Sequence, residues 1–102
     1  MVAQPSFTDE RSSERRWVRV RALIREAGSQ RLDIDLVDLS INGFRFESLY
    51  AFAPGARVFI SFPGLAPLEA TIAWRNRDQY GCRLTHALHP AIFDNLAHRF
   101  RS

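Results

Sequence analysis

The sequence has little of what stabilises or anchors many small proteins: it contains one cysteine, no lysine and no long apolar run. A single thiol, Cys82, cannot form an internal disulfide, and we expect it to be a small buried apolar residue. No uncharged apolar stretch reaches the roughly 18 residues that a membrane span needs. Residues 1–10 also lack the basic and apolar regions of a signal peptide. We therefore expect a cytoplasmic protein without a membrane segment.

The residue patterns of the common catalytic and metal sites are also missing. The five glycines are scattered singly, so no Gly-rich loop is available to bind a phosphate. Asp38 and Ser40 occur without the Gly-x-Ser-x-Gly turn of a serine hydrolase, so a triad with a distant histidine has no support. The three histidines, His86, His89 and His98, do not have zinc-ligand spacing. We expect neither enzymatic activity nor a bound metal.

What the chain does contain is arginine, and its distribution is uneven. All fourteen basic residues are arginines, and six of them lie between Arg11 and Arg25 against a single acid, Glu14. The rest of the composition is that of an ordinary globular domain, with 102 residues and a net charge of +3. Arginine forks bind phosphates bidentately and can grip the O6/N7 edge of guanine in the same way. The cluster therefore indicates an anionic ligand.

Alternating apolar and polar residues predict a fold rich in β-structure. Six short strands are expected, separated by turns of Gly, Pro, Asn and Asp. Their ranges are Trp17–Arg25, Leu32–Val37, Phe44–Glu47, Arg57–Phe62, Leu68–Trp74 and Tyr80–Leu84. Strands at this regular spacing suggest a closed barrel or a compact sandwich.

The two ends of the chain depart from the strand pattern. Residues 1–13 have little apolar periodicity, so we expect a flexible N-terminal tail before a domain over residues 14–102. Near the other end, His89-Pro90 is typical of a helix start. An apolar stripe at helical spacing follows it: Ile92, Phe93, Leu96 and Phe100. The expected architecture is all-β with one helix, a six-stranded antiparallel β-barrel with a C-terminal α-helix.

Two short motifs lie on this strand pattern. The first, Arg-x-x-x-Arg, is formed by Arg15 and Arg19 at the start of the first expected strand. The second, Asp-x-Ser-x-x-Gly, is formed by Asp38, Ser40 and Gly43 at a corner between two strands, nineteen residues after the second arginine. Alone, the second motif would also suit an ordinary turn, because Asp, Ser and Gly commonly end strands. Together the motifs supply guanidinium forks, a carboxylate and a hydroxyl for a phosphate-bearing ligand.

This pair of motifs, in this order and followed by a final helix, resembles the PilZ domain family over residues 11–101. PilZ domains are bacterial receptors for the second messenger cyclic di-GMP. The resemblance implies a six-stranded β-barrel with a flanking helix. It also implies a stand-alone receptor that acts as an adaptor for an unidentified downstream protein. One departure concerns the loop between the arginines, since many members carry a proline just before the second one, where this chain has Trp17-Val18.

The resemblance implies roles for the arginines of the first motif. Arg15 and Arg19 would hold phosphates and guanine edges through charged hydrogen bonds. Arg16 could replace or assist Arg15, and Arg11 with Arg15 offers a second Arg-x-x-x-Arg. Because these arginines follow the expected tail, ligand binding would tie that tail to the barrel. We therefore expect cyclic di-GMP to act as a switch by ordering the N-terminal segment.

The resemblance also implies roles for the second motif. Asp38 and Ser40 would lie at the barrel surface, where the carboxylate of Asp38 would accept hydrogen bonds from the N1 and N2 donors of guanine. The hydroxyl of Ser40 would serve the base or the phosphate, and Gly43 would permit the turn geometry and a close approach of the ligand.

Two other functions remain as alternatives. The first is a PilZ-like protein-interaction module that does not bind the nucleotide. The second is a general nucleic-acid binder, which a net charge of only +3 and the lack of aromatics interleaved with basic residues disfavour. Three aromatic residues are expected to serve core or cross-strand packing: Trp17, Trp74 and Tyr80.

Overall fold

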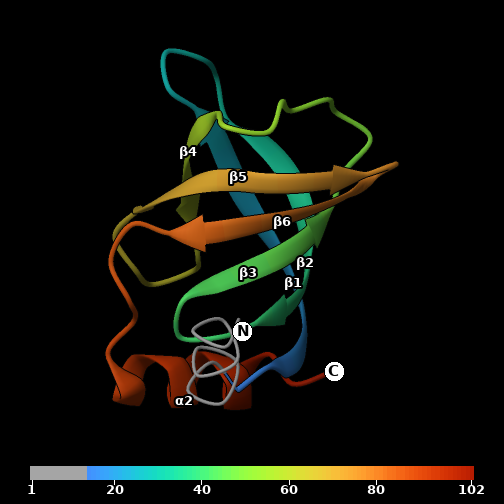
Figure 1. Ribbon diagram of the computed structural model, residues 1–102. Helices are drawn as coiled ribbons and strands as arrows, with labels where there is room; N and C mark the ends of the chain where they lie inside the picture. The colour runs from blue at the N-terminus through green and yellow to red at the C-terminus, as the bar shows by residue number, and fades with distance from the viewer. Residues whose placement is uncertain (1–13) are drawn as a thin grey trace, which may run out of the picture.

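The computed structural model describes residues 14–102, so the expected tail over residues 1–13 lies outside the described residues. The described chain forms six strands and one helix (Figure 1). Their bounds are β1 Arg16–Glu26, β2 Leu32–Leu39, β3 Gly43–Glu47, β4 Arg57–Ser61, β5 Leu68–Asn76, β6 Gln79–Leu84 and α2 Pro90–Arg99. The expected order of six strands and a C-terminal helix is confirmed.

The six strands close into an antiparallel barrel in the order β1-β2-β3-β6-β5-β4. Apolar and polar residues alternate along β1, so that one face of the strand lies in the core and the other on the surface. Ile24 is buried, for example, whereas Arg21 is exposed. The core also holds aromatic rings, and those of Phe46 and Tyr80 stack with centroids 5.0 Å apart. The Tyr80 hydroxyl donates to the carbonyl oxygen of Tyr50 at 3.0 Å, so its polar end is satisfied. Tyr80 is therefore a core residue, as expected.

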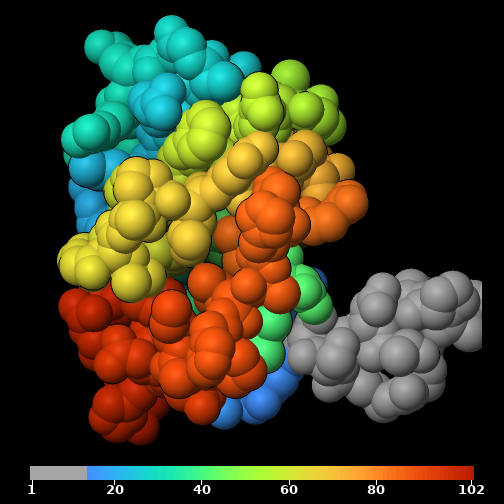
Figure 2. Space-filling model, turned by 90° about the vertical axis from the view of Figure 1, so that its left-hand side faces the viewer, coloured from blue at the N-terminus to red at the C-terminus, as the bar shows by residue number. Residues whose placement is uncertain are grey.

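Helix α2 covers one end of the barrel, and the β1–β2 turn forms the opposite end (Figures 1 and 2). His89 caps the helix, because its Nδ1 accepts from the backbone N–H of Ala91 at 3.0 Å, and Pro90 occupies the first turn. The buried residues of α2 are Phe93, Leu96 and Ala97. No helix among residues 14–102 is both long enough and apolar enough to cross a membrane.

The residues after α2 return to the start of β1. The backbone N–H of Arg19 donates to the carbonyl oxygen of Phe100 at 2.8 Å, and Val18 forms a β-bridge with Arg101. On its other side the same stretch pairs with β2, where Arg16 lies opposite Leu39. The start of β1 is therefore held between β2 and the residues that follow the helix.

Candidate ligand-binding site

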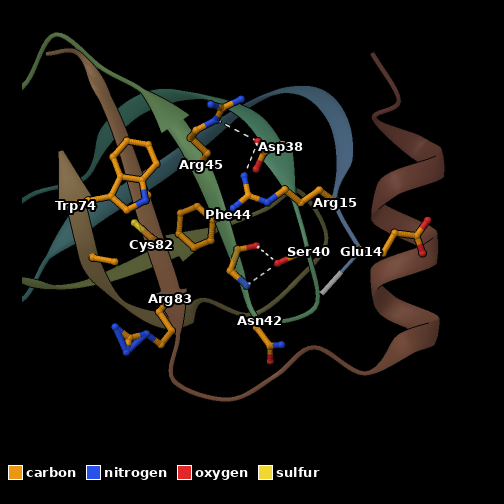
Figure 3. A pocket seen from close by; sticks show the side chains of 13 residues that line it. Glu14, Arg15, Asp38, Ser40, Asn42, Phe44, Arg45, Trp74, Cys82 and Arg83 are labelled. Atoms are coloured by element: carbon orange, nitrogen blue, oxygen red, sulfur yellow. Dashed lines mark hydrogen bonds and ion pairs between the residues drawn. The ribbon is translucent and has the colours of Figure 1, made fainter. Parts of the chain in front are cut away.

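A pocket of about 560 Å³ lies at the corner between β2 and β3 and extends towards β5 and β6 (Figure 3). Its size is in the range of small-molecule binding sites. The residues that line it are Glu14, Arg15, Asp38, Ser40, Asn42, Gly43, Phe44, Arg45, Ala73, Trp74, Gly81, Cys82 and Arg83. Charged and hydroxyl groups from the residues just before β1 and from the β2–β3 hairpin therefore face a pocket wall formed by β5 and β6.

Asp38 lies between two arginines. Its Oδ2 is 3.0 Å from Nε of Arg45, which stands directly opposite it in the β2–β3 pairing. The same oxygen is 3.6 Å from Nη1 of Arg15. Asp38 is only 4% exposed and Ser40 only 9%, so the expectation that both lie at the barrel surface is wrong. The carboxylate can be buried because Arg45 supplies a counter-charge beside it.

Arg45 is a pocket residue that the motifs did not include. Its Nε is buried and has no hydrogen bond of normal geometry, so the contact with Asp38 is chiefly electrostatic. Its guanidinium lies 5.4 Å from the ring centroid of Trp17. Trp17 itself is 65% exposed, so it is not a core residue, and its ring packs against an arginine instead. Strand alternation and the register of the β2–β3 hairpin could have placed Arg45 opposite Asp38.

Ser40 and Gly43 form the corner itself. The backbone N–H of Ser40 donates to the Gly43 carbonyl oxygen at 2.8 Å, and the N–H of Gly43 donates to Ser40 Oγ at 3.1 Å. The Ser40 hydroxyl also lies 3.2 Å from that carbonyl oxygen, to which it donates. Gly43 does not have a positive φ, so the backbone conformation of the corner does not by itself require a glycine. A Cβ there would overlap the carbonyl oxygen of Cys82, so β3 and β6 need a glycine in order to pair.

The remaining arginines of the first motif do not line the pocket. The guanidinium of Arg16 lies 5.7 Å from the ring centroid of Phe93 on α2. Arg19 is exposed on β1 and is not among the lining residues. Arg11 lies outside the described residues. Four of the expected ligand residues share the pocket: Arg15, Asp38, Ser40 and Gly43.

The β5–β6 wall supplies residues that the sequence analysis did not assign to a site. Trp74 is 40% exposed and packs across strands on Gly81, so of the two expected roles, core or cross-strand packing, it has the second. Glycine inside a strand commonly marks a close approach, and Gly81 between Tyr80 and Cys82 was the available signal. Cys82 is buried as expected, and burial raises the pKa of its thiol to about 12. This thiol is therefore protonated and unreactive near neutral pH.

Comparison with known proteins identifies the family. The family model described as PilZ domain matches residues 9–98, which is nearly the whole chain and agrees with the resemblance over residues 11–101. No curated protein matches the sequence. Among residues 14–102, no group of three or more His, Cys, Asp or Glu side chains could hold a metal ion. PilZ domains are non-catalytic and are typically receptors for cyclic di-GMP. The chain therefore belongs to the PilZ domain family and is not an enzyme.

Proposed function

We propose that this PilZ domain is a receptor that binds cyclic di-GMP in the pocket at the β2–β3 corner. One observation carries the proposal: Arg15 of the first motif shares a cavity of about 560 Å³ with Asp38, Ser40 and Gly43 of the second. Cyclic di-GMP carries two phosphates and two guanines. It therefore needs cations for the phosphates and hydrogen-bonding groups for the base edges within one cavity.

The contacts of Arg15 suit a residue that changes partner on binding. Its side chain is 67% exposed, and its contact with Asp38 is long, at 3.6 Å. Arg15 is largely exposed and its contact with the buried Asp38 is long, and Asp38 keeps Arg45 as a closer partner, so Arg15 can turn to a phosphate at small cost. Arg45 stays beside Asp38 at 3.0 Å and keeps the carboxylate in place.

The second motif offers acceptors for the base. Both ion pairs of Asp38 end on Oδ2, so we assign Oδ1 to the N1 and N2 donors of guanine. The Ser40 hydroxyl accepts one hydrogen bond from Gly43 and donates one to it, which leaves a lone pair on Oγ for a ligand donor. A base that presents the wrong edge would leave these buried groups unpaired, and this is the source of selectivity that we propose.

A calorimetric titration with cyclic di-GMP tests the proposal, with cyclic di-AMP, GTP, cyclic GMP and single-stranded RNA as comparisons at two salt concentrations. We expect selective binding of cyclic di-GMP. Equal affinity for cyclic di-AMP would contradict the base assignment. Preference for RNA would favour the nucleic-acid binder. No binding by a folded sample would favour the interaction module that does not use the nucleotide.

Variants separate the two arginines of the first motif. We expect Arg15→Ala to weaken binding by at least about tenfold, or about 1.4 kcal/mol, because a charged contact inside the pocket is lost. The motif predicts a similar loss for Arg19→Ala, and Arg16→Ala tests whether Arg16 assists. If Arg19→Ala and Arg16→Ala bind like the parent while Arg15→Ala does not, the pocket lining defines the ligand residues better than the motif does.

We further propose that the ligand orders the segment before β1 and so signals to a downstream protein. Because β1 begins at Arg16 and its start is held on both sides, the effect is confined to residues 11–15. Ordering costs roughly 1 kcal/mol or more per residue, so the charged contacts of Arg15 can offset only a short segment. The downstream protein, the adaptor role and the cytoplasmic location stay predictions.

Amide hydrogen exchange with and without cyclic di-GMP measures this ordering. Protection should rise in residues 11–15 and 38–43, and α2 should change little. Ligand binding without a change before β1 would refute the switch and leave the receptor proposal standing.

A further inference from the structure

Trp17 is a large aromatic residue that serves neither the core nor the lining of the pocket. It is 65% exposed, and it lies between Arg15 and Arg19 without being one of the lining residues. Its backbone is fixed on both sides. Trp17 pairs with Asp38 on β2, and its carbonyl oxygen accepts from the backbone N–H of Ser102 at 3.3 Å. A tryptophan held in place at the surface therefore needs a role other than core packing.

Trp17 belongs to a row of residues that crosses three strands. It lies opposite Asp38 in the β1–β2 pairing, and Arg45 lies opposite Asp38 in the β2–β3 pairing. Neighbouring strands are about 4.8 Å apart, so the backbones of Trp17 and Arg45 are separated by roughly 10 Å. The guanidinium carbon of Arg45 is nevertheless 5.4 Å from the centroid of the Trp17 ring. The two long side chains therefore meet over the shorter Asp38 between them.

This aromatic cover distinguishes Asp38 from a second carboxylate on β2. Asp35 lies opposite Arg21 on β1 and is paired with it at 2.9 Å. The side chain of Asp35 is nevertheless 61% exposed, whereas that of Asp38 is 6% exposed. The residues opposite Asp35 are Arg21 and Glu47, and neither has an aromatic ring. An arginine partner alone thus does not bury a carboxylate on this strand.

The ring also gives the Arg45 side chain a direction. Figure 3 shows Arg45 beside Asp38 at the pocket. Its Nε has no hydrogen bond of normal geometry, so the 3.0 Å contact with Oδ2 of Asp38 is electrostatic and tolerates many orientations. Stacking is more restrictive, because a cation is attracted to the face of an aromatic ring. The contact of Arg45 with Trp17 therefore holds the guanidinium where it occupies Oδ2 and leaves Oδ1 to the ligand.

We propose that Trp17 is a positioning residue for the carboxylate that reads the base. Its ring fixes Arg45, and Arg45 holds Asp38 so that Oδ1 faces the guanine edge. The inference rests on the proposed function and adds the means by which the base-reading group is oriented. Trp17 acts through Arg45 and does not itself contact the nucleotide. A carboxylate that is already oriented loses less freedom on binding, and this strengthens the complex.

Affinity for cyclic di-GMP in single variants tests this role. Trp17→Leu should weaken binding by about fivefold, the factor that one cation–π contact at a partly exposed site supports. Trp17→Tyr should bind within about twofold of the parent, because an aromatic ring remains for the guanidinium. Tyr50→Leu is the matched control, since Tyr50 is a 50% exposed aromatic residue outside the pocket lining. Melting curves show that each variant is folded.

A double-mutant cycle distinguishes positioning from direct contact or from general support of β1. The same Trp17→Leu exchange is made in an Arg45→Gln background, because glutamine keeps a donor for Asp38 but has no charge for the ring. Positioning through Arg45 predicts that Trp17→Leu then changes the affinity by less than about twofold. A tryptophan that contacts the nucleotide, or that only supports the strand, would give the same loss in both backgrounds.

The outcomes separate this inference from the proposed function. If the parent binds cyclic di-GMP and Trp17→Leu binds within about twofold of it, the positioning role is overturned and the receptor proposal stands. An equal loss from Trp17→Leu with and without Arg45 would overturn the role in the same way, as would a Trp17→Tyr protein that binds as weakly as Trp17→Leu. If the parent does not bind cyclic di-GMP at all, both proposals are overturned.

Discussion

Removal of the Asp38 carboxylate should destabilise the fold as well as weaken binding. Asp38 is 4% exposed and lies 3.0 Å from Arg45, so Asp38→Ala leaves that guanidinium without its nearest counter-charge. Breaking a buried pair in this way costs about 3–5 kcal/mol. The Arg45 side chain is 24% exposed and stacks on Trp17, so we expect a smaller loss, about 2 kcal/mol. For a domain of this size the melting temperature would fall by roughly 8–16 °C.

Thermal and urea denaturation measure this loss, and Asp35→Ala provides the control. Asp35 lies on the same strand and is paired with Arg21 at 2.9 Å, but both side chains are more than half exposed. Such a pair contributes about 0.2–1 kcal/mol, so the control should remain close to the parent. The double variant Asp38→Ala with Arg45→Met should be more stable than the sum of the single effects predicts, because no unpaired charge remains.

Two results would refute the reasoning about Asp38. One is an Asp38→Ala protein as stable as Asp35→Ala, which would mean that burial of the carboxylate has no energetic consequence. The other is strict additivity of Asp38→Ala and Arg45→Met, which would mean that the 3.0 Å contact carries no coupling. Affinities of Asp38→Ala for cyclic di-GMP must be measured at a temperature at which the variant is folded.

Three further predictions concern the rest of the pocket. Gly43→Ala should lower the melting temperature because its methyl group meets the Cys82 carbonyl oxygen; an unchanged melting temperature would contradict the close β3–β6 approach. The raised pKa of Cys82 means that its contribution to stability is complete below pH 9.0 and is lost as the pH rises towards 12, since the unfolded thiol ionises first. Urea denaturation across this range should show the free energy of unfolding falling as the pH rises, and Cys82→Val should show a smaller fall. Rapid reaction of the native thiol with a disulfide reagent near pH 8 would contradict its burial. Arg83→Ala should weaken cyclic di-GMP binding and reduce its dependence on salt, because Arg83 lines the pocket. Calorimetry at two salt concentrations measures both effects, and an affinity equal to that of the parent at each concentration would contradict the prediction.

The barrel could be predicted because each strand carries its own pattern of alternating apolar and polar residues. Alternation places Ile24 inside and Arg21 outside whichever strand lies next to β1. The two motifs likewise identified four residues that share the pocket, although they lie on separate segments. The sequence also pointed to the helix start, since His89 and Pro90 have capping preferences of their own.

The features that the sequence did not reveal depend on neighbours in space. Asp38 is buried because Arg45 faces it from the adjacent strand, and the outward position of Asp38 in its own strand did not reveal that partner. Trp74 continues the apolar alternation of β5, and the sequence could not decide between a core and a cross-strand role because the pairing with β6 shifts between Ile72 and Trp74. Gly43 was expected to permit the turn, and the close approach of the Cys82 carbonyl group on β6 is a second reason for a glycine there. In each case the deciding contact crosses between strands.

The closed strand order limits how another protein can bind this domain. Every strand within residues 14–102 has two hydrogen-bonded neighbours, because β1 pairs with both β2 and β4. A closed sheet presents no free edge, so another polypeptide cannot extend it by strand addition. Recognition of the barrel itself must then depend on side chains at its surface. If the domain binds cyclic di-GMP as we propose, a protein that distinguishes its bound from its free form would contact side chains around the β2–β3 corner.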